Sequence, residues 1–431
     1  MSTIIGLDFG TTNSAIAAAA PDGSTVLTTF AGDGYRTTTF RSVLYFDPEH
    51  RTADCKPQAM AGPTAIISYL QADTRGRLMQ SMKSHLSSRL FRETYVFGER
   101  YTLEDLIAII LRELRSAAEA QFGDIGNRVV VGRPVHFSGA ARAEDDAFAL
   151  SRLRAALKQA GFGDIVFEFE PVAAAYEFES QLDHDELILI ADFGGGTSDF
   201  SLMQVGPSMR RRGHTAEDIL GTDGVAIAGD TFDSKIVRHL VAPKLGQGSQ
   251  YRSAFNKVLP VPAWLYTNLE RWHYLSFLKS KTTMDMLAEL RLQAFEPEKI
   301  AALINVIEYD LGYHLYRAVE QTKIELSEQE MSALRFRDAA LAIAQAVRRD
   351  EFDGWIGDEI TAIAACLDRL LEHTGVAPTD VGSVFMTGGS SFVPAVRQLF
   401  EARFGASRIH SGGELTSVAK GLALRALDLG H

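Results

Sequence analysis

The sequence contains very few cysteines. Cys55 and Cys366 are the only two, they lie far apart, and neither belongs to a Cys-x-x-Cys pair. We therefore expect neither a disulfide framework nor a cysteine-based zinc site, and we expect a reducing compartment. The 11 histidines show no spacing typical of metal ligands. These absences predict a cytoplasmic protein without a structural transition metal.

Long apolar runs and a basic charge balance are also missing. No run reaches the roughly 20 apolar residues of a membrane-spanning helix, and the N-terminus lacks the pattern of a signal peptide. Lys and Arg number 43 against 55 Asp and Glu, which gives a net charge of −12. A nucleic-acid interface needs a basic face, so we expect neither nucleic-acid nor acidic-membrane partners. Backbone N–H groups can still hold a phosphate locally.

Length and hydrophobic spacing predict an α/β protein with two similar halves. At 431 residues the chain exceeds one ordinary core. Alternation predicts an opening meander of three strands at Thr3–Phe9, Ser14–Ala20 and Ser24–Phe30. The further elements predicted for the first half are helices at 103–121 and 143–161, strands at 128–131 and 165–170, and a helix from 172.

The second half is predicted to begin as the first does. Leu187–Phe193 and Ser198–Val205 are expected to form a hairpin around a glycine turn. Two matched α/β units that face each other would place both glycine turns at one cleft. The remaining predictions are helices at 230–240 and 356–374, an irregular segment at 246–262, a largely helical stretch at 264–326, a strand at 381–387, a helix from 395 and a closing helix at 417–427.

Two segments repeat one pattern of aspartate, glycine and threonine. "DFGTTN" begins at Asp8 and "DFGGGTSDF" at Asp192, each at the end of an apolar strand. A turn rich in Gly and Thr aims backbone N–H groups at one point, which makes a phosphate cradle. Glycines let an oxyanion approach the backbone closely, and threonine hydroxyls add donors. The residues concerned are Gly10, Thr11, Thr12, Gly194, Gly195, Gly196 and Thr197.

The aspartates beside these turns call for a cation, because carboxylates would otherwise repel phosphates. Mg²⁺ keeps several of its waters, and carboxylates often hold it through them. Asp8 and Asp192 are therefore predicted to orient hydrated Mg²⁺ on a nucleoside polyphosphate. Either segment alone can also be an ordinary hairpin turn, but two matched turns with aspartates favour the nucleotide interpretation.

Other nucleotide motifs do not fit these segments. No Gly-Lys-Ser/Thr follows, as a P-loop requires, and the glycines lead into a strand rather than the helix of a Rossmann fingerprint. The letters DFG occur twice, but without a kinase catalytic loop. A third glycine segment, "FMTGGSSFVP", is predicted to place Gly388 and Gly389 at a strand end, where they can lie against a flat ring.

Together these motifs resemble the nucleotide-binding domain of the 70-kilodalton heat-shock protein (Hsp70) family, within the actin-like ATPase superfamily. "DFGTTN" and "DFGGGTSDFS" resemble its phosphate loops, "VVVGRPVHF" its strand with a proline turn at Pro134, and "FEPVAAAYEF" and "SVAKGLAL" its connecting motifs. "AGDTFD", "VEQTKIELS" and "TGGSSFVP" resemble its nucleoside-binding segments. The resemblance implies an actin-like ATPase fold, with two lobes, each built on a duplicated ribonuclease H-like α/β unit, and ATP in the cleft between them.

The resemblance also implies roles for individual residues. Asp8 and Asp192 would orient Mg²⁺, Glu170 would lie nearby as a further acid, and Thr197 would contact phosphate or the attacking water. The residues expected to bind ATP or ADP are Gly10, Thr11, Thr12, Asn13, Gly194, Gly195, Gly196, Gly229, Glu320, Lys323, Ser327, Gly388, Gly389, Ser390 and Phe392. Of these, Glu320, Lys323 and Ser327 would face the ribose and adenine.

The sequence departs from the family pattern at the catalytic lysine. The nearest match, "AGPTAI", has Ile66 at that position, and Lys83 in "SMKSHL" is our hypothesis for a substitute. Phosphoryl transfer depends on a placed positive charge, so hydrolysis is expected to be slow or absent. Phe392 replaces an arginine that stacks on adenine, and it would either stack or pack in the core. Asn13 replaces a tyrosine.

The resemblance is closest to the short YegD-type chaperone-like proteins, which lack the peptide-binding domain. We therefore expect an ATP-binding, chaperone-like protein and slow Mg²⁺-dependent ATPase whose lobes move with nucleotide. The first lobe would comprise residues 1–186 and the second 187–431, with a helical insert at about 246–326 and a closing helix that packs back toward the first lobe. A protein client or co-chaperone is left open. The alternatives are a small-molecule kinase, with Asp199 or Asp230 as its base, and a filament-forming actin relative.

Overall fold

The chain separates into two compact units, and each is described by itself. Unit 1 comprises residues 1–229, 360–391 and 396–431, and unit 2 comprises residues 230–359 and 392–395. The predicted lobe boundary at residue 186 therefore falls inside unit 1. The structure is a computed structural model that describes residues 4–32, 34–52, 54–72, 76–180, 182–270, 275–309, 311–338, 341–411 and 416–429.

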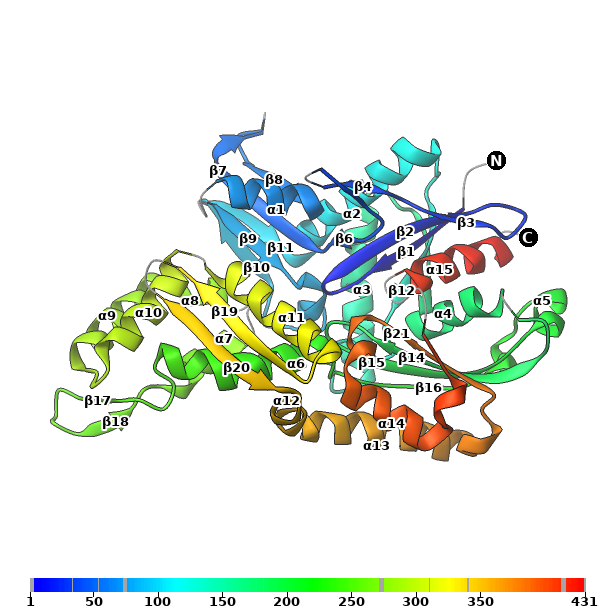
Figure 1. The fold of residues 1–431 in the computed structure, drawn as a ribbon. Helices are drawn as coiled ribbons and strands as arrows, with labels where there is room; N and C mark the ends of the chain where they lie inside the picture. The colour runs from blue at the N-terminus through cyan, green and yellow to red at the C-terminus, as the bar shows by residue number, and fades with distance from the viewer. Residues whose placement is uncertain are drawn as a thin grey trace. The chain divides into compact units, whose positions relative to one another are not determined.

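Unit 1 contains two β-sheets with the same strand order (Figure 1). In each sheet an antiparallel meander of three strands is extended by two strands that add in parallel beside its first strand. The first sheet runs β3 (Thr25–Leu27), β2 (Asn13–Ala19), β1 (Ile4–Phe9), β12 (Arg128–Arg133) and β13 (Asp164–Phe169), with β6 (Phe40–Arg41) also paired to β2. The second runs β16 (Ile219–Val225), β15 (Ser198–Val205), β14 (Glu186–Phe193), β21 (Ser383–Thr387) and β22 (Ile409–Ser411).

The helices repeat with the strands. In each half one long helix precedes the fourth strand of the sheet, another connects the fourth strand to the fifth, and a third follows the fifth. This repeated order is the duplication that the two glycine turns indicated. The helices are α2 (Leu103–Phe122), α3 (Ala143–Gln159) and α4 (Glu170–Glu179) in the first half, and α13 (Gly357–Thr374), α14 (Pro394–Phe404) and α15 (Ser417–Asp428) in the second.

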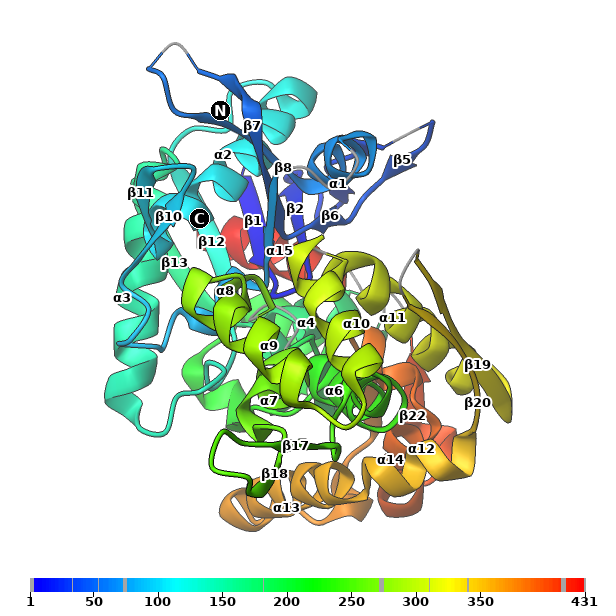
Figure 2. The same cartoon turned by 90° about the vertical axis from the view of Figure 1, so that its left-hand side faces the viewer.

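Strand alternation explains how the first sheet packs. Ile5, Leu7 and Phe9 of β1 belong to the core that includes α2 and α3. Gly6 faces the other way, where an added Cβ would lie 2.2 Å from the backbone nitrogen of Ala423 in α15. The alanines of β2 on the same side pack on alanines of α15. Small residues thus let α15 lie close against β1 and β2, and Figure 2 shows this helix beside the two strands.

Helices α4 and α15 cross at very short distance. They share a core with Val130 of β12 and Ile188 of β14, so they contact both sheets. A Cβ on Gly421 of α15 would lie 1.7 Å from the carbonyl oxygen of Ala173 in α4. Only glycine fits at this crossing, because any larger residue would overlap the backbone of the other helix.

The segment from residue 30 to residue 102 contains strands and helices that the sequence did not predict. They extend the first half outside its main sheet, and they end at Thr102, whose side chain caps α2 by accepting from the N–H of Asp105. The elements are β4 (Phe30–Ala31), β5 (Arg36–Thr37), β7 (Val43–Arg51), β8 (Pro57–Ala61), α1 (Gly62–Gln71), β9 (Arg77–Gln80), the 3₁₀ turn Met82–His85, β10 (Glu93–Val96) and β11 (Glu99–Thr102). The second half has its own short addition, α5 (Pro207–Arg212), between β15 and β16.

Unit 2 is mainly helical, as predicted for residues 264–326, although residues 271–274 and 310 lie outside the described residues. The prediction of an irregular segment at 246–262 is wrong, because the strands β17 and β18 form a hairpin there. A second hairpin was also not predicted. The elements are α6 (Gly229–Ile236), β17 (Gln250–Arg252), β18 (Val258–Pro260), α7 (Ala263–Glu270), α8 (Leu275–Leu278), α9 (Lys281–Gln293), α10 (Pro297–Glu308), α11 (Gly312–Glu328), β19 (Met331–Arg337), β20 (Ala342–Arg348) and α12 (Arg349–Trp355).

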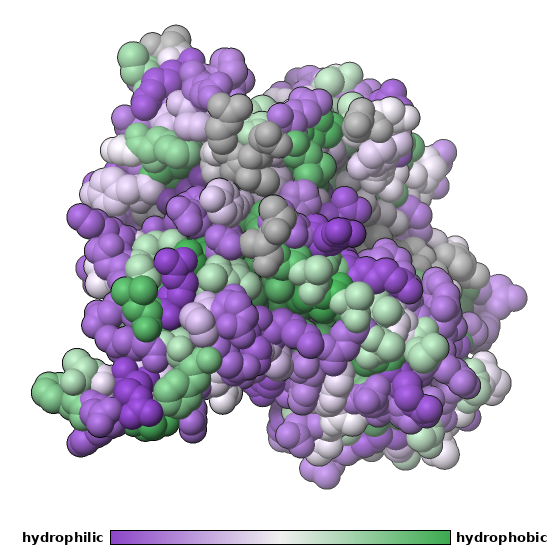
Figure 3. Space-filling model, turned by 60° about the vertical axis from the view of Figure 1, so that its left-hand side comes forward, coloured by the Kyte–Doolittle hydropathy of each residue, from purple (hydrophilic) through white to green (hydrophobic). Residues whose placement is uncertain are grey.

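The β17–β18 hairpin exposes apolar side chains. Phe255 in its turn is 88% exposed and Val258 is 46% exposed. In Figure 3 the projection at the lower left, where this hairpin lies, presents hydrophobic residues directly beside hydrophilic ones. Among the helices of the described residues, none has the length and apolar character that crossing a membrane requires.

Candidate functional site

The first glycine bend joins β1 to β2 and is closed by serine hydroxyls. The N–H of Gly10 donates to Oγ of Ser14 at 3.2 Å, and Oγ of Ser42 donates to the carbonyl oxygen of Gly10 at 2.8 Å. The two serine hydroxyls lie 2.8 Å apart. A Cβ on Gly10 would lie 2.0 Å from the carbonyl oxygen of Asn13. Gly10 is therefore required by the bend itself, in addition to the access that the sequence suggested.

The second glycine bend joins β14 to β15 and carries the third glycine segment against it. Within the bend, the N–H of Gly194 donates to the carbonyl oxygen of Thr197 at 3.0 Å. The carbonyl oxygen of Gly194 accepts from the N–H of Gly229 at 3.4 Å and from Oγ of Ser390 at 3.5 Å. Gly388 has φ +79°, and a Cβ there would lie 2.0 Å from the carbonyl oxygen of Phe193. The predicted segments around Gly194, Gly229 and Gly388 thus meet.

The two bends face each other. A Cβ placed on Gly196 of the second bend would lie 3.6 Å from Oγ1 of Thr11 in the first. It would also lie 3.8 Å from Oγ of Ser84 and 3.7 Å from Cβ of Ser138. The structure thereby brings together the predicted residues Thr11 and Gly196. Ser84 and Ser138 join them from segments whose sequence gave no signal of a site.

Carboxylates lie beside the bends, at the ends of their strands: Asp192 is buried and Asp8 is half-buried. Burial raises the pKa of Asp8 to about 8, and the negative charges of Glu170 and Asp192 act in the same direction. Burial and Glu170 raise the pKa of Asp192 to about 6, although Oγ1 of Thr387 donates to its Oδ1 at 2.6 Å. At pH 7 Asp8 is therefore largely protonated, whereas Asp192 is largely ionised, and burial is the main cause of both shifts.

Lys83 supplies the cation that contacts this cluster. Its Nζ lies 2.6 Å from Oε1 of Glu170, and both side chains are 8% exposed. Burial by itself lowers the pKa of Lys83, but the charges of Glu170 and Asp8 outweigh it and raise the pKa above its usual range. The amine is therefore charged. Ser81, just before the 3₁₀ turn that carries Lys83, has φ +56°, a strained conformation of the kind that clusters at functional sites.

Lys83 is our hypothesis for a substitute for the catalytic lysine of the family, whose position is occupied here by Ile66. Ile66, which occupies the position expected from the sequence, lies part-buried in α1. Lys83 instead reaches the carboxylates from the next segment of the chain, and its charge lowers the pKa of both Asp8 and Asp192. The structure thus gives the hypothesis about Lys83 a physical basis.

Asp199 is a further buried acid of the second bend, and the sequence offered it only as an alternative base. It is 1% exposed, and its Oδ1 accepts from the N–H of Val135 at 2.7 Å. Its Oδ2 makes no hydrogen bond of good geometry within the described part of the chain. Burial and Glu170 raise its pKa to about 8, against the effect of the Thr197 hydroxyl. A carboxyl group with one oxygen left over can accept a proton from a bound hydroxyl or water.

The residues present fit a hydrated divalent cation. The charge of Glu170 raises the pKa of Asp8, Asp192 and Asp199, and Oδ2 of Asp199 has no hydrogen bond of good geometry within the described residues, so added positive charge would favour the ionised form of all three. No group of three or more His, Cys, Asp or Glu side chains within the described ranges is arranged to hold a metal directly. This donor set suits Mg²⁺ held through its waters better than a directly ligated ion.

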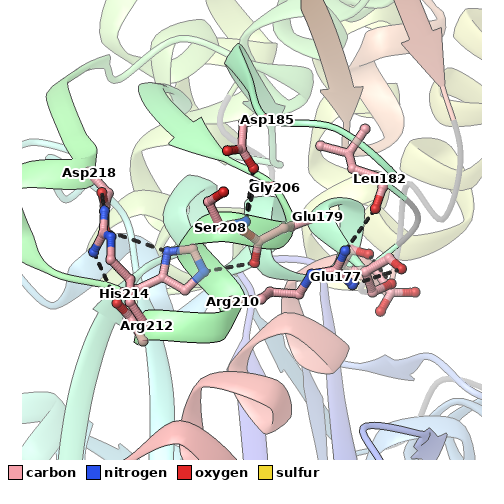
Figure 4. A network of polar contacts seen from close by, with 12 residues as sticks. Glu177, Glu179, Leu182, Asp185, Gly206, Ser208, Arg210, Arg212, His214 and Asp218 are labelled. Carbon is pink, nitrogen blue, oxygen red and sulfur yellow. Dashed lines mark hydrogen bonds and ion pairs between the residues drawn. The ribbon is translucent and has the colours of Figure 1, made fainter.

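Helix α4 carries Glu170 as its first residue, and a buried polar network holds its other end (Figure 4). Glu179, the last residue, accepts from the N–H of Gly206 at 2.7 Å and lies 2.7 Å from Nε2 of His214. Nδ1 of His214 is 3.9 Å from Asp218, which pairs with Arg212. Buried contacts therefore fix the helix at both ends.

Four of the predicted nucleoside contacts belong to unit 2 and are described there alone. Glu320, Lys323 and Ser327 lie on α11 at helical spacing. Nζ of Lys323 lies 2.9 Å from a carboxylate oxygen of Asp233, and Oγ of Ser327 donates to the carbonyl oxygen of Lys323 at 3.0 Å. Phe392 is 55% exposed, so it does not pack in the core and its ring is free for stacking.

The chain matches the model of a known protein family. A family model described as "Hsp70 protein" matches residues 4–250 and 308–429. The matched ranges contain both glycine bends, Lys83, the buried carboxylates and the predicted nucleoside segments. The match leaves out residues 251–307, most of the predicted helical insert.

Proposed function

The chain belongs to the Hsp70 family and is an ATP-binding, Hsp70-like protein, and from this premise we propose that it binds Mg–ATP at the two facing bends and hydrolyses it slowly. The observation that carries the proposal is the meeting of Thr11 and Gly196 beside the carboxylates Asp8 and Asp192. Two phosphate cradles of this kind suit the tail of one nucleotide.

In this proposal each part of the site has a separate task. The backbone and hydroxyl groups of the bends bind the phosphates, and Asp8 and Asp192 hold hydrated Mg²⁺, which would neutralise charge on the phosphates. Glu170 positions the charged amine of Lys83, while Asp199 orients the attacking water and accepts its proton. Placed charge of this kind is the main source of catalysis in phosphoryl transfer. Lys83 pairs directly with Glu170, and the charge of Arg133 also acts on Glu170 and Asp199 without an ion pair among the described residues; so little direct positive charge supports a slow reaction.

Titration with a fluorescent ATP analogue, with and without Mg²⁺, tests this function. We expect binding that weakens at least tenfold when Mg²⁺ is removed, and also in Asp8→Asn and Asp192→Asn. Asp285→Asn, at an exposed position of α9, is the matched control. Absence of ATP binding, or affinity that neither Mg²⁺ nor the two variants change, would overturn the proposal. A phosphate-release assay then measures hydrolysis.

We further propose that nucleotide alters how the two units are arranged, because predicted contacts for one nucleotide are divided between them. Cys55 is exposed and Cys366 is buried, so a dye on Cys55 and a second dye on Asp285→Cys report the separation of the units. We expect energy transfer to change on adding Mg–ATP, and unchanged transfer at saturation would contradict this. The unpaired cysteines support a location in the cytoplasm, and a protein client or co-chaperone is the partner that an Hsp70-like protein would serve.

A second candidate function is phosphoryl transfer to a small molecule, and Asp199 is the observation that favours it. Its raised pKa and spare oxygen suit a base that takes a proton from a substrate hydroxyl as well as from water. The two functions differ in their products. Consumption of ATP that depends on an added sugar or polyol, without release of phosphate, would establish the kinase and exclude simple hydrolysis.

A further inference from the structure

The segment outside the family match contains an ordered hairpin. Within residues 251–307, which the Hsp70 match omits, β18 pairs with β17 through Tyr251–Leu259 and Arg252–Val258. The connecting turn is closed by hydrogen bonds, since the N–H of Ser253 donates to the carbonyl oxygen of Lys257 at 2.8 Å. An ordered hairpin presents its side chains without an additional cost for fixing the backbone on binding.

The chain beyond α9 supports the base of this hairpin. The N–H of Phe295 donates to the carbonyl oxygen of Gln250 at 2.9 Å, and Ala294 forms a bridge with Tyr251. The guanidinium of Arg252 lies 5.7 Å from the centre of the Phe295 ring. The hairpin is thus attached to the helices of unit 2 along one edge, and its turn extends away from them (Figure 1).

The tip of the hairpin combines apolar and basic side chains. Phe255 is 88% exposed, Val258 is 46% exposed and Leu259 is 38% exposed. Arg252 shares a face with Val258, because they are paired, and Lys257 lies in the turn directly before β18. The tip therefore presents two cations beside apolar residues, and Phe255 lies in the turn between Arg252 and Lys257.

Carboxylates neutralise only part of the positive charge of this region. Residues 234–269 contain five Lys and Arg and no Asp or Glu, in a chain whose net charge is −12. Lys235 pairs with Glu359 and Arg238 with Glu270. Arg252 donates to Oδ1 of Asn256 at 2.8 Å and lies over the Phe295 ring. Neither Arg252 nor Lys257 forms an ion pair within the described ranges, so no carboxylate neutralises their positive charge at the tip.

The free edge of the hairpin is unsuited to adding another strand. Pro260 lies in β18 and has no N–H to donate, and Pro262 follows it. Prolines and a lysine at a strand edge are typical protection against backbone pairing. Recognition must therefore use the side chains of the tip, and so it depends on their charge and hydrophobicity.

We propose that the tip formed by Arg252, Phe255, Lys257, Val258 and Leu259 is a docking surface for an acidic polypeptide segment with apolar side chains. Carboxylates on that segment complement the two cations, and its apolar residues cover Phe255. A short segment contacts the tip alone, whereas an anionic bilayer or a second copy of the chain would also meet the negative charge of the whole molecule. This surface adds a partner site to the nucleotide site and does not use the residues of either bend.

Fluorescence anisotropy tests the docking surface with the full chain. The probe is a fluorescein-labelled peptide of 16 residues in which glutamate alternates with leucine and phenylalanine, and its control has lysine in place of glutamate. We expect binding of the acidic probe to weaken at least tenfold in Phe255→Ser and at least fivefold in Lys257→Glu. High salt should weaken it as well. The matched controls are Leu90→Ser, at a residue 96% exposed in unit 1, and Lys158→Glu on the exposed side of α3.

Several outcomes would overturn the proposal. Equal binding of the lysine probe, or equal loss in Leu90→Ser, would show general adhesion to exposed apolar residues. Binding to vesicles with anionic lipid but not to the acidic probe would identify a membrane instead. Self-association in sedimentation that Phe255→Ser abolishes would identify a second copy as the occupant. Because Phe255 and Lys257 are exposed, the variants should retain circular dichroism and nucleotide binding, which separates this result from a failure to fold.

Discussion

Replacement of Lys83 by methionine removes the cation of a buried pair. Nζ of Lys83 and Oε1 of Glu170 are 2.6 Å apart, with side chains 8% exposed. At that distance two unit charges attract by about 6 kcal/mol at an effective dielectric constant of 20. Desolvation of both ions offsets much of that attraction, so the relevant quantity is the cost of leaving Glu170 buried and unpaired. We expect a loss of about 3–5 kcal/mol in unfolding free energy.

The same change should affect hydrolysis more than binding. Lys83 lowers the pKa of Asp8 and Asp192, so without it both carboxyl groups keep their protons to higher pH and hold a hydrated cation less well. Loss of a placed charge typically costs about 100-fold or more in rate. We expect Lys83→Met to reduce single-turnover phosphate release at least 100-fold, while affinity for ATP at pH 8 changes less than tenfold.

Two controls distinguish this pair from a general effect of losing a lysine. Lys158→Met, on the exposed side of α3, should change neither quantity. Lys83→Met combined with Glu170→Gln should recover at least half of the lost stability, since no charge is then left unpaired. Urea unfolding followed by circular dichroism gives the stability. The reasoning is refuted if Lys83→Met turns over within twofold of the wild type, or if its unfolding free energy equals that of Lys158→Met.

Three further predictions follow from buried groups. First, the pKa of Asp199 is about 8 in the folded state and 3.8 when exposed, so the folded chain holds a proton that the unfolded chain releases. The contribution of the Asp199 carboxyl group to the free energy of unfolding is most favourable below about pH 4. It falls by up to about 1.4 kcal/mol per pH unit as the pH rises to about 8. The nucleotide-free Asp199→Asn variant should therefore gain stability relative to the wild type across this range in urea titrations, and parallel pH profiles would contradict this. Second, Gly421→Ala should lower stability by about 3 kcal/mol in thermal unfolding, because its Cβ would lie 1.7 Å from a backbone oxygen, whereas Gly354→Ala, with open space, should be neutral. Third, His214→Ala should cost about 2–3 kcal/mol by leaving Oε2 of the buried Glu179 without its partner, although Oε1 keeps the N–H of Gly206. His184→Ala, at a side chain 64% exposed, should cost little, and equal melting temperatures for the two histidine variants would count against the network.

Local pattern was sufficient to predict the hairpins that carry the bends. β15 has the predicted bounds Ser198–Val205, because a glycine turn marks its start and Gly206 follows its last residue. β19 carries the alternation of a half-buried strand, since Ser332, Leu334 and Phe336 are buried and the residues between them are more exposed. The helical spacing that precedes β19 in the sequence hides this alternation. β17 and β18 have three residues each, and Pro260 and Pro262 favoured an irregular segment there.

Contacts between distant residues could not be predicted from local pattern. Lys83 and Glu170 are 87 positions apart, and nothing in "SMKSHL" specifies which carboxylate its lysine meets. Ser84 and Ser138 reach Gly196 only because separate segments converge. The division into units also departs from the predicted lobes, since residues 360–391 return to the unit that contains the first half. Such features depend on tertiary packing rather than on spacing.

The crossing at Gly421 divides α4 into two parts of unequal length, and a tilt of α4 about this point would move its two ends by different amounts. The crossing falls at Ala173, which is three residues from Glu170 and six from Glu179 in a helix of 10 residues. At 1.5 Å per residue the two parts are about 4.5 Å and 9 Å long. If α4 tilted about the crossing so that Glu179 moved by about 2 Å, Glu170 would move by roughly 1 Å in the opposite direction. A misplacement of that size is large against the spacing of the lysine pair and can change a catalytic rate about 100-fold.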